Sequence, residues 1–119
     1  MAVFFKTKNP RDLLQTFNDR IEQEEKEGKI TTWHRNSTGD YTHKAAQWQR
    51  KAWFRPVVIE ATESVEPMLR FNLIPPKDSK IDRVTWGYYH GHLTETFLNH
   101  FENFFTYAIS SAKPMIKRK

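Results

Sequence analysis

The stretch Thr85–Phe97, TWGYYHGHLTETF, holds the residues best suited to chemistry. His90 and His92 flank Gly91, and imidazole is a common zinc ligand. On a strand both histidines would lie on one side, as a metal clip requires. A zinc site needs three or four ligands, and the further candidates are distant in sequence or fall in the next element: Glu95, His34, His43 and His100. The alternative is the end of a strand with its histidines hydrogen-bonded in the core. We therefore predict no metal.

The two glycines of this stretch suggest a different site. Gly87 and Gly91 leave the backbone bare on either side of Tyr89, and glycine in a strand often marks a bulge or a close approach by a ligand or another chain. A slot with Tyr89 and Trp53 as walls would suit a flat organic molecule or a side chain of a protein partner. A simple bend of the strand is the alternative. The predicted ligand-binding residues are Trp53, Trp86, Tyr88, Tyr89 and His90.

Nucleic acid is a second possible partner. The segment KAAQWQRKAWFR, residues 44–55, interleaves cations with tryptophans, a combination that single-strand binders use to hold phosphates and stack bases. Its candidate contacts are Lys44, Trp48, Arg50, Lys51 and Arg55, together with the basic tail 113–119. Both tryptophans could instead belong to the core, and the sequence has no helix-turn-helix, zinc-finger or RNA-recognition signature.

Enzyme readings find less support. No nucleophile elbow, Walker loop, HExxH pair or dinucleotide-binding turn is present. The chain has no cysteine, so thiolate chemistry and disulfides are excluded. His90 beside Tyr88 or Tyr89 could act as a general acid or base, or with His92 hold a metal, and such an enzyme is the third hypothesis. No cofactor is predicted.

Composition favours one globular domain over residues 1–119, with a frayed tail at 113–119. The only apolar run at the N-terminus is Ala2 to Phe5, too short for a signal peptide, and no segment is long enough to span a membrane, so we expect a cytoplasmic protein. The net charge is +5. Residues 29–59 carry six basic side chains and one acidic, which permits an acidic partner or describes a solvated face.

The first predicted element is a helix. Asn9 suits its N-cap, Pro10 its first position, and Gly28 the position that ends it. Apolar residues recur at helical spacing: Leu13, Leu14, Phe17 and Ile21. The run 22–27 is acidic and is expected to be solvated.

A hairpin is expected around Asn36–Gly39, NSTG. A four-residue loop would place Arg35 opposite Asp40 and turn Trp33 away from His34 and His43. A five-residue loop would shift the register by one and exchange these faces.

Two further strands are expected. One contains Trp53 to Ile59, with Pro56 at an edge or bulge. The other, MLRFNLI, turns Leu69, Phe71 and Leu73 to one face. A last strand is predicted from about Ile81 to His92, followed by a helix that ends at Pro114 and carries an apolar stripe: Leu93, Phe97, Phe101, Phe104, Phe105, Ala108 and Ala112.

The predicted fold is α+β: an antiparallel sheet of four or five strands, with an N-terminal and a C-terminal helix packed on one face. The other face would be partly open, and the surplus of tryptophan and tyrosine suggests that a second copy covers it. The sequence therefore favours a small homodimeric binding or interaction module.

Overall fold

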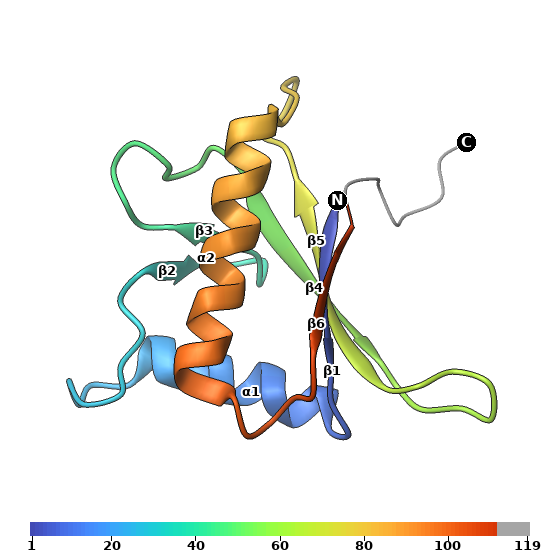
Figure 1. The fold of residues 1–119 in the computed structure, drawn as a ribbon. Coiled ribbons are helices and arrows are strands. Elements are labelled where there is room, and N and C mark those ends of the chain that lie inside the picture. The colour runs from blue at the N-terminus through green and yellow to red at the C-terminus, as the bar shows by residue number, and fades with distance from the viewer. Residues whose placement is uncertain (112–119) are drawn as a thin grey trace.

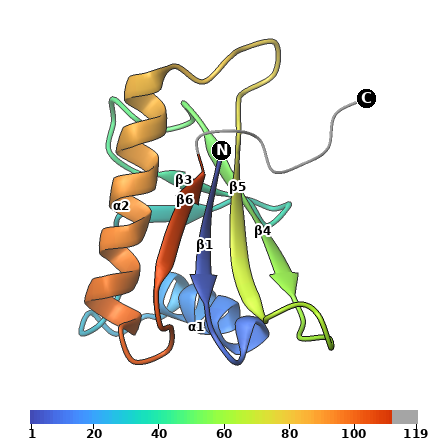
Figure 2. The same ribbon diagram turned by 45° about the vertical axis from the view of Figure 1, so that its right-hand side comes forward.

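The computed structural model describes residues 1–111, so the predicted tail at 113–119 and the predicted helix stop at Pro114 lie outside the described residues. Along the chain the elements are β1 (Ala2–Lys6), α1 (Pro10–Glu22), β2 (Trp33–Arg35), β3 (Tyr41–His43), β4 (Trp53–Ile59), β5 (Met68–Ile74), α2 (Arg83–Phe101) and β6 (Ala108–Ser111). Both helices lie on one side of the sheet (Figures 1 and 2). The predicted α+β class with an antiparallel sheet is confirmed. Within residues 1–111 the sheet has six strands rather than four or five.

The strand order is β2-β3-β4-β5-β1-β6, with antiparallel neighbours throughout. The five residues of β1 were not predicted as a strand, yet β1 lies between β5 and β6. Val3 pairs with Phe71 on one side and with Ser110 on the other. These partners lie far away in the sequence, so local pattern gives no sign of the pairing.

Helix α1 confirms the predicted apolar stripe. Leu13 and Phe17 are buried, and Pro10 occupies the first turn. Asn9 stands at the N-cap, but its side chain makes no capping hydrogen bond. The helix ends earlier than predicted, because Gln23 has extended backbone angles. Gly28 instead has a φ of +76° in the loop that follows, a conformation that favours glycine.

The hairpin has the five-residue loop. Arg35 pairs with Tyr41, and Trp33 pairs with His43, so the two buried aromatic residues Trp33 and Tyr41 face the core. Asp40 does not face Arg35. Its carboxylate accepts two hydrogen bonds from Arg55, at 3.1 and 2.8 Å.

The prediction for the last third of the chain is wrong. Residues Arg83–Phe101 form helix α2, not a strand followed by a helix, and the residues after it return as strand β6. Asp82 is the N-cap, and its side chain accepts a hydrogen bond from the Thr85 amide at 2.8 Å. This hydrogen bond also lowers the pKa of Asp82. The buried side chains follow a helical period: Thr85, Tyr89, His90, Leu93, Thr96, Phe97 and Phe101.

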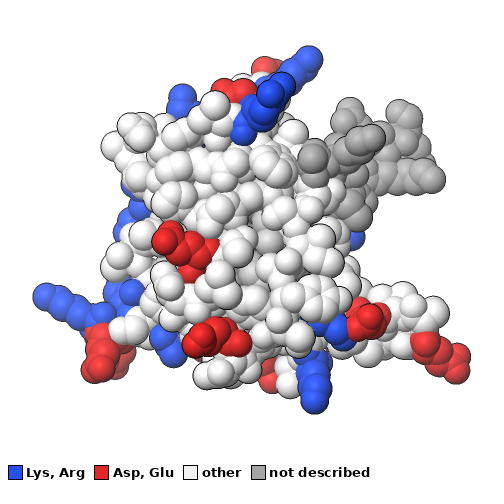
Figure 3. All heavy atoms as spheres, in the orientation of Figure 1, with Lys and Arg blue, Asp and Glu red and all other residues white. Residues whose placement is uncertain are grey.

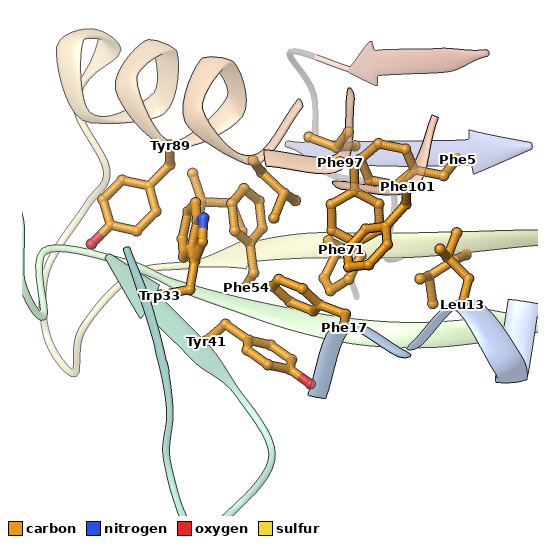
Figure 4. Close-up of a cluster of buried hydrophobic side chains, with 14 of the residues drawn as sticks. Phe5, Leu13, Phe17, Trp33, Tyr41, Phe54, Phe71, Tyr89, Phe97 and Phe101 are labelled. Atoms are coloured by element: carbon orange, nitrogen blue, oxygen red, sulfur yellow. The ribbon is translucent and has the colours of Figure 1, made fainter. Parts of the chain in front are cut away.

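The core lies between the helices and the sheet. Figure 4 shows rings from α2 interleaved with rings from the strands and α1. Phe97 stacks on Phe5 with centroids 4.2 Å apart and lies 5.0 Å from Phe17. Phe71 of β5 makes edge-on contacts with all three of these rings, Phe5, Phe17 and Phe97. Because each aromatic ring buries a large area, α2 is fixed chiefly by these contacts.

The opposite face of the sheet carries no helix (Figure 1). The strand registers turn a mixed set of side chains toward it. Its apolar members are half-buried except Ile109, which is exposed: Phe4, Trp53, Val57, Ile59, Met68, Ile74 and Ile109. Its charged members are all cations: Lys6, Arg55 and Arg70.

No helix among residues 1–111 combines the length and the apolar character needed to cross a membrane.

Candidate functional site

Four of the predicted ligand-binding residues, Trp86, Tyr88, Tyr89 and His90, lie in the first two turns of α2. The fifth, Trp53, lies on β4 and faces away from the helices, since its neighbour Phe54 faces the core. Tyr89 is fully buried (Figure 4). The predicted slot between Tyr89 and Trp53 is therefore wrong, because a helix, not a strand, carries Tyr89 and the sheet separates the two rings.

Tyr89 fastens α2 to the segment that follows β3. Its hydroxyl donates a hydrogen bond to the Trp48 carbonyl and lies 3.0 Å from the Thr42 hydroxyl oxygen. That Thr42 oxygen also accepts from the Arg50 amide at 2.9 Å and donates to the Ala52 carbonyl at 3.0 Å. The turn 44–52 is thus held in place by two buried side chains, Tyr89 of α2 and Thr42 of β3.

Three rings form a stacked column along one flank of α2. Trp48 stacks on Tyr88 with centroids 4.1 Å apart, and Tyr88 stacks on His92 at 4.0 Å. His43 meets both Tyr88 and His92 edge-on at 5.0 Å. The column is half-buried, whereas His43 is buried, and burial and the nearby His92 lower the pKa of His43 to about 4. At neutral pH His43 is an uncharged imidazole.

His90 lies on the inner side of α2 and is 4% exposed. Its ring packs against Trp86 at 4.3 Å and against Phe54 at 5.9 Å. Neither ring nitrogen has a hydrogen-bond partner. Burial, and to a lesser degree the N-terminal ammonium group, lower its pKa to about 4. A general acid must reach its substrate, and this imidazole is enclosed and neutral.

The helix also separates the two histidines of the sequence motif. Residues two apart on a helix lie about 200° apart around its axis, so His90 and His92 face different surroundings. His92 Nδ1 lies 3.7 Å from a carboxylate oxygen of Glu95, on the outer side. Within residues 1–111 no three histidine, aspartate or glutamate side chains gather closely enough to hold a metal ion. The hypothesis that His90 and His92 bind one metal ion together is therefore wrong.

The outer side of α2 is the feature that sequence reasoning missed. Val84 and Leu98 are 69% and 52% exposed, and between them lie Gly87 and Gly91. A Cβ atom built on either glycine would meet no atom within 4 Å. Figure 3 shows that this face has few charged side chains, with acidic groups over the lower half of the helix and both basic and acidic groups at its upper end. The signal in the sequence was the spacing 84, 87, 91 and 98, which places all four on one helix side.

The predicted nucleic-acid segment 44–55 is only partly available. Lys44, Arg50 and Lys51 are exposed on the turn before β4. Arg55 is held by Asp40, and one face of the Trp48 ring is covered by Tyr88. The structure therefore leaves three exposed cations beside a half-buried indole.

A surface cleft of about 390 Å³ lies at the opposite end of α2 from these aromatic rings. The turn after β1, the start of α1 and the segment after α2 enclose it, and Lys8, Asp12 and Phe104 are among its lining residues. None of the predicted site residues belongs to it.

Comparison with protein-family models, with curated proteins and with solved structures finds no match to this chain. The interpretation of the site therefore rests on its own geometry.

Proposed function

We propose that this protein is an interaction module that binds another protein through the outer side of α2. The observation that carries this proposal is the exposure of Val84 and Leu98 on either side of a bare backbone at Gly87 and Gly91. Burying such side chains against a partner stabilises a complex by about 1.5 to 3 kcal/mol for each one fully buried.

The two glycines support the same reading. Glycine inside a helix costs about 1 kcal/mol relative to alanine. No neighbouring atom accounts for them, because the space above Gly87 and Gly91 is open. No neighbour within the monomer requires their small size, whereas the absence of a side chain lets a partner approach the helix backbone closely.

The aromatic residues predicted from the sequence keep a place in this proposal. Tyr88 and Trp48 are half-buried and flank the outer side of α2, while Tyr89 and His90 hold the helix from beneath. Half-exposed aromatic rings beside an apolar patch are typical of the energetic centre of protein interfaces. Tyr88 is thus the aromatic residue best placed to contact a partner.

Photo-crosslinking in the producing cells tests the proposal. A benzophenone amino acid at Leu98 should give a covalent adduct with whatever protein covers α2. The same amino acid at Val65, 44% exposed in the loop between β4 and β5, is the matched control and should give none. Equal adducts at both positions, or none at Leu98, would overturn the proposed surface.

Nucleic acid is the competing partner, because Lys44, Arg50 and Lys51 remain exposed. Binding through cations weakens steeply as salt rises. Titration of a labelled single strand at two salt concentrations decides between the readings. We expect weak, salt-sensitive binding that Arg50→Ala with Lys51→Ala abolishes and Leu98→Glu leaves unchanged.

A further inference from the structure

The outer side of α2 has a symmetry that identifies an occupant. Val84 and Leu98 each lie seven residues from Gly91, and the helix rises about 1.5 Å per residue, so each apolar side chain lies about 10 Å from the centre. If a second α2 lies antiparallel across this centre, Val84 of each copy meets Leu98 of the other. Gly91 meets Gly91 at the axis, where neither has a side chain to hold the helices apart.

The charges along α2 are arranged for the same pairing. Arg83 is exposed in the first turn of α2, Lys80 is exposed in the loop before the N-cap, and Glu102 is exposed just after the end of the helix. No ion pair within residues 1–111 involves any of these three side chains. A two-fold axis at Gly91 brings the start of one α2, with Arg83 in its first turn and Lys80 in the loop before it, to the end of the other α2, where Glu102 lies. Each such charge pair occurs twice in a symmetric dimer.

The turn 44–52 extends this complementarity. Trp48 stacks on Tyr88, and Lys51 lies close enough to Asp82 to help lower its pKa, so the basic turn lies beside the first half of α2. Glu95 and Glu102 lie on the second half. Asp78 and Asp82 are exposed at this end too, but the cations Lys51, Lys80 and Arg83 outnumber them. Antiparallel pairing therefore brings a net basic half against an acidic half, which favours association and fixes its direction.

The open face of the sheet, which the sequence suggested as the dimer surface, fits a second copy less well. All of its charged side chains are cations: Lys6, Arg55 and Arg70. Lys6 is paired with Glu66 and Arg55 with Asp40, but Arg70 lies near the middle, over the Phe4 ring. Pairing this face with itself about a central axis would bring two Arg70 side chains together, whereas α2 pairs opposite charges.

We propose that the partner on α2 is a second copy of this chain, docked with its own α2 antiparallel across a two-fold axis at Gly91. This inference rests on the proposed function, since it names the occupant of the same surface.

Disulfide trapping tests the axis directly. The chain has no cysteine, so Gly91→Cys introduces a single thiol. Across the axis the Cα atoms of the two introduced cysteines come within about 4.4 to 6.8 Å of each other, the separation that a disulfide spans. We expect mild oxidation to convert most of the folded protein to a linked dimer. Ser37→Cys, exposed on the β2–β3 turn, is the matched control and should link at least tenfold more slowly. Equal rates would overturn the axis.

Charge reversal tests the direction of pairing. Lys80→Glu or Glu102→Lys alone should raise the dimer Kd roughly tenfold, since each change affects two exposed pairs. The two changes together should restore the Kd, because the opposite charges meet again. Glu63→Lys, in the exposed loop between β4 and β5, is the control and should have little effect. Failure of the double variant to recover would exclude the antiparallel register.

The Leu98 crosslink separates the two proposals. An adduct of twice the 14.2 kDa chain mass, with rapid Gly91→Cys linking, supports the second copy. A Leu98 adduct of another mass, with a chain that stays monomeric in sedimentation at high micromolar concentration, overturns the second copy and leaves the interaction module standing. The absence of any Leu98 adduct overturns both.

Discussion

His90 is a polar side chain that the core encloses without a hydrogen-bond partner. Both nitrogens are unpaired, and the pKa is lowered to about 4. The folded protein keeps His90 neutral down to about pH 4, whereas the unfolded chain protonates it near 6.5. The unfolded state therefore binds more protons in this window, and the free energy of unfolding falls as pH drops from about 6.5 to about 4. The pKa of His43 is also lowered to about 4, so His43 adds to this loss of stability at low pH.

We predict that His90→Leu changes stability at pH 7 by less than about 1 kcal/mol, since an apolar group of similar size replaces an unpaired one. At pH 4.5 the variant should be more stable than the parent, because it has no proton to exclude. Urea denaturation at both pH values measures this. His34→Leu, at an exposed position on β2, is the control. Parallel loss of stability in parent and His90→Leu would show that His90 does not cause the acid sensitivity.

Tyr89 is a buried side chain whose hydroxyl group is hydrogen-bonded. Tyr89→Phe keeps the ring and removes the hydroxyl that binds the Trp48 carbonyl. We expect a loss of about 1 to 3 kcal/mol, because a buried acceptor is left without its donor. Hydrogen exchange should quicken at the Arg50 amide, which depends on the same cluster. If exchange quickens equally at amides of β1, the variant has destabilised the whole fold and the turn has no special dependence on Tyr89.

The two glycines of α2 differ from the loop glycines in what a Cβ would meet. Gly91→Ala should stabilise the monomer by about 1 kcal/mol, since the site is helical and the space is open. Gly28→Ala should destabilise it by at least as much, because φ there is +76° and the Arg20 guanidinium lies 2.9 Å from the added Cβ. Thermal melting at low concentration, where self-association is weakest, compares the two. A Gly91→Ala variant that melts lower than the parent would contradict the open space above α2.

Helix α2 shows why sequence reasoning misplaced the candidate site. Its first half is rich in residues with high strand propensity, and its two glycines disfavour a helix, so local preference favours a strand. Burial against the sheet overrides that preference. The contrary evidence was present in the i, i+4 spacing of Tyr89, Leu93, Phe97 and Phe101, and in Asp82 three residues before Thr85. Read together, they start one helix at Arg83 and place the glycines on its outer side.

The fold class was predictable because it depends on element types, whereas the sheet order was not. The alternation of β5 and the stripe of α1 gave a correct two-layer α+β fold. The position of β1 between β5 and β6 depends on pairing with residues far along the chain, since Val3 pairs with Phe71 and with Ser110. Such contacts are selected by the assembled core, with Phe5 against Phe71 and Phe97, and leave no local trace.

Self-association should link the stability of the whole molecule to its concentration. If only the folded chain dimerises through α2, the melting temperature rises with protein concentration. Gly91→Gln should behave differently. Glutamine favours the helix more than glycine and has open space in the monomer, but it keeps two helices apart at the axis. At low micromolar concentration we expect the variant to melt above the parent. At high micromolar concentration the parent gains stability from dimer formation and the variant does not, so the order should reverse. Curves that stay parallel would mean that Gly91 has no part in a self-contact, whatever else binds the surface.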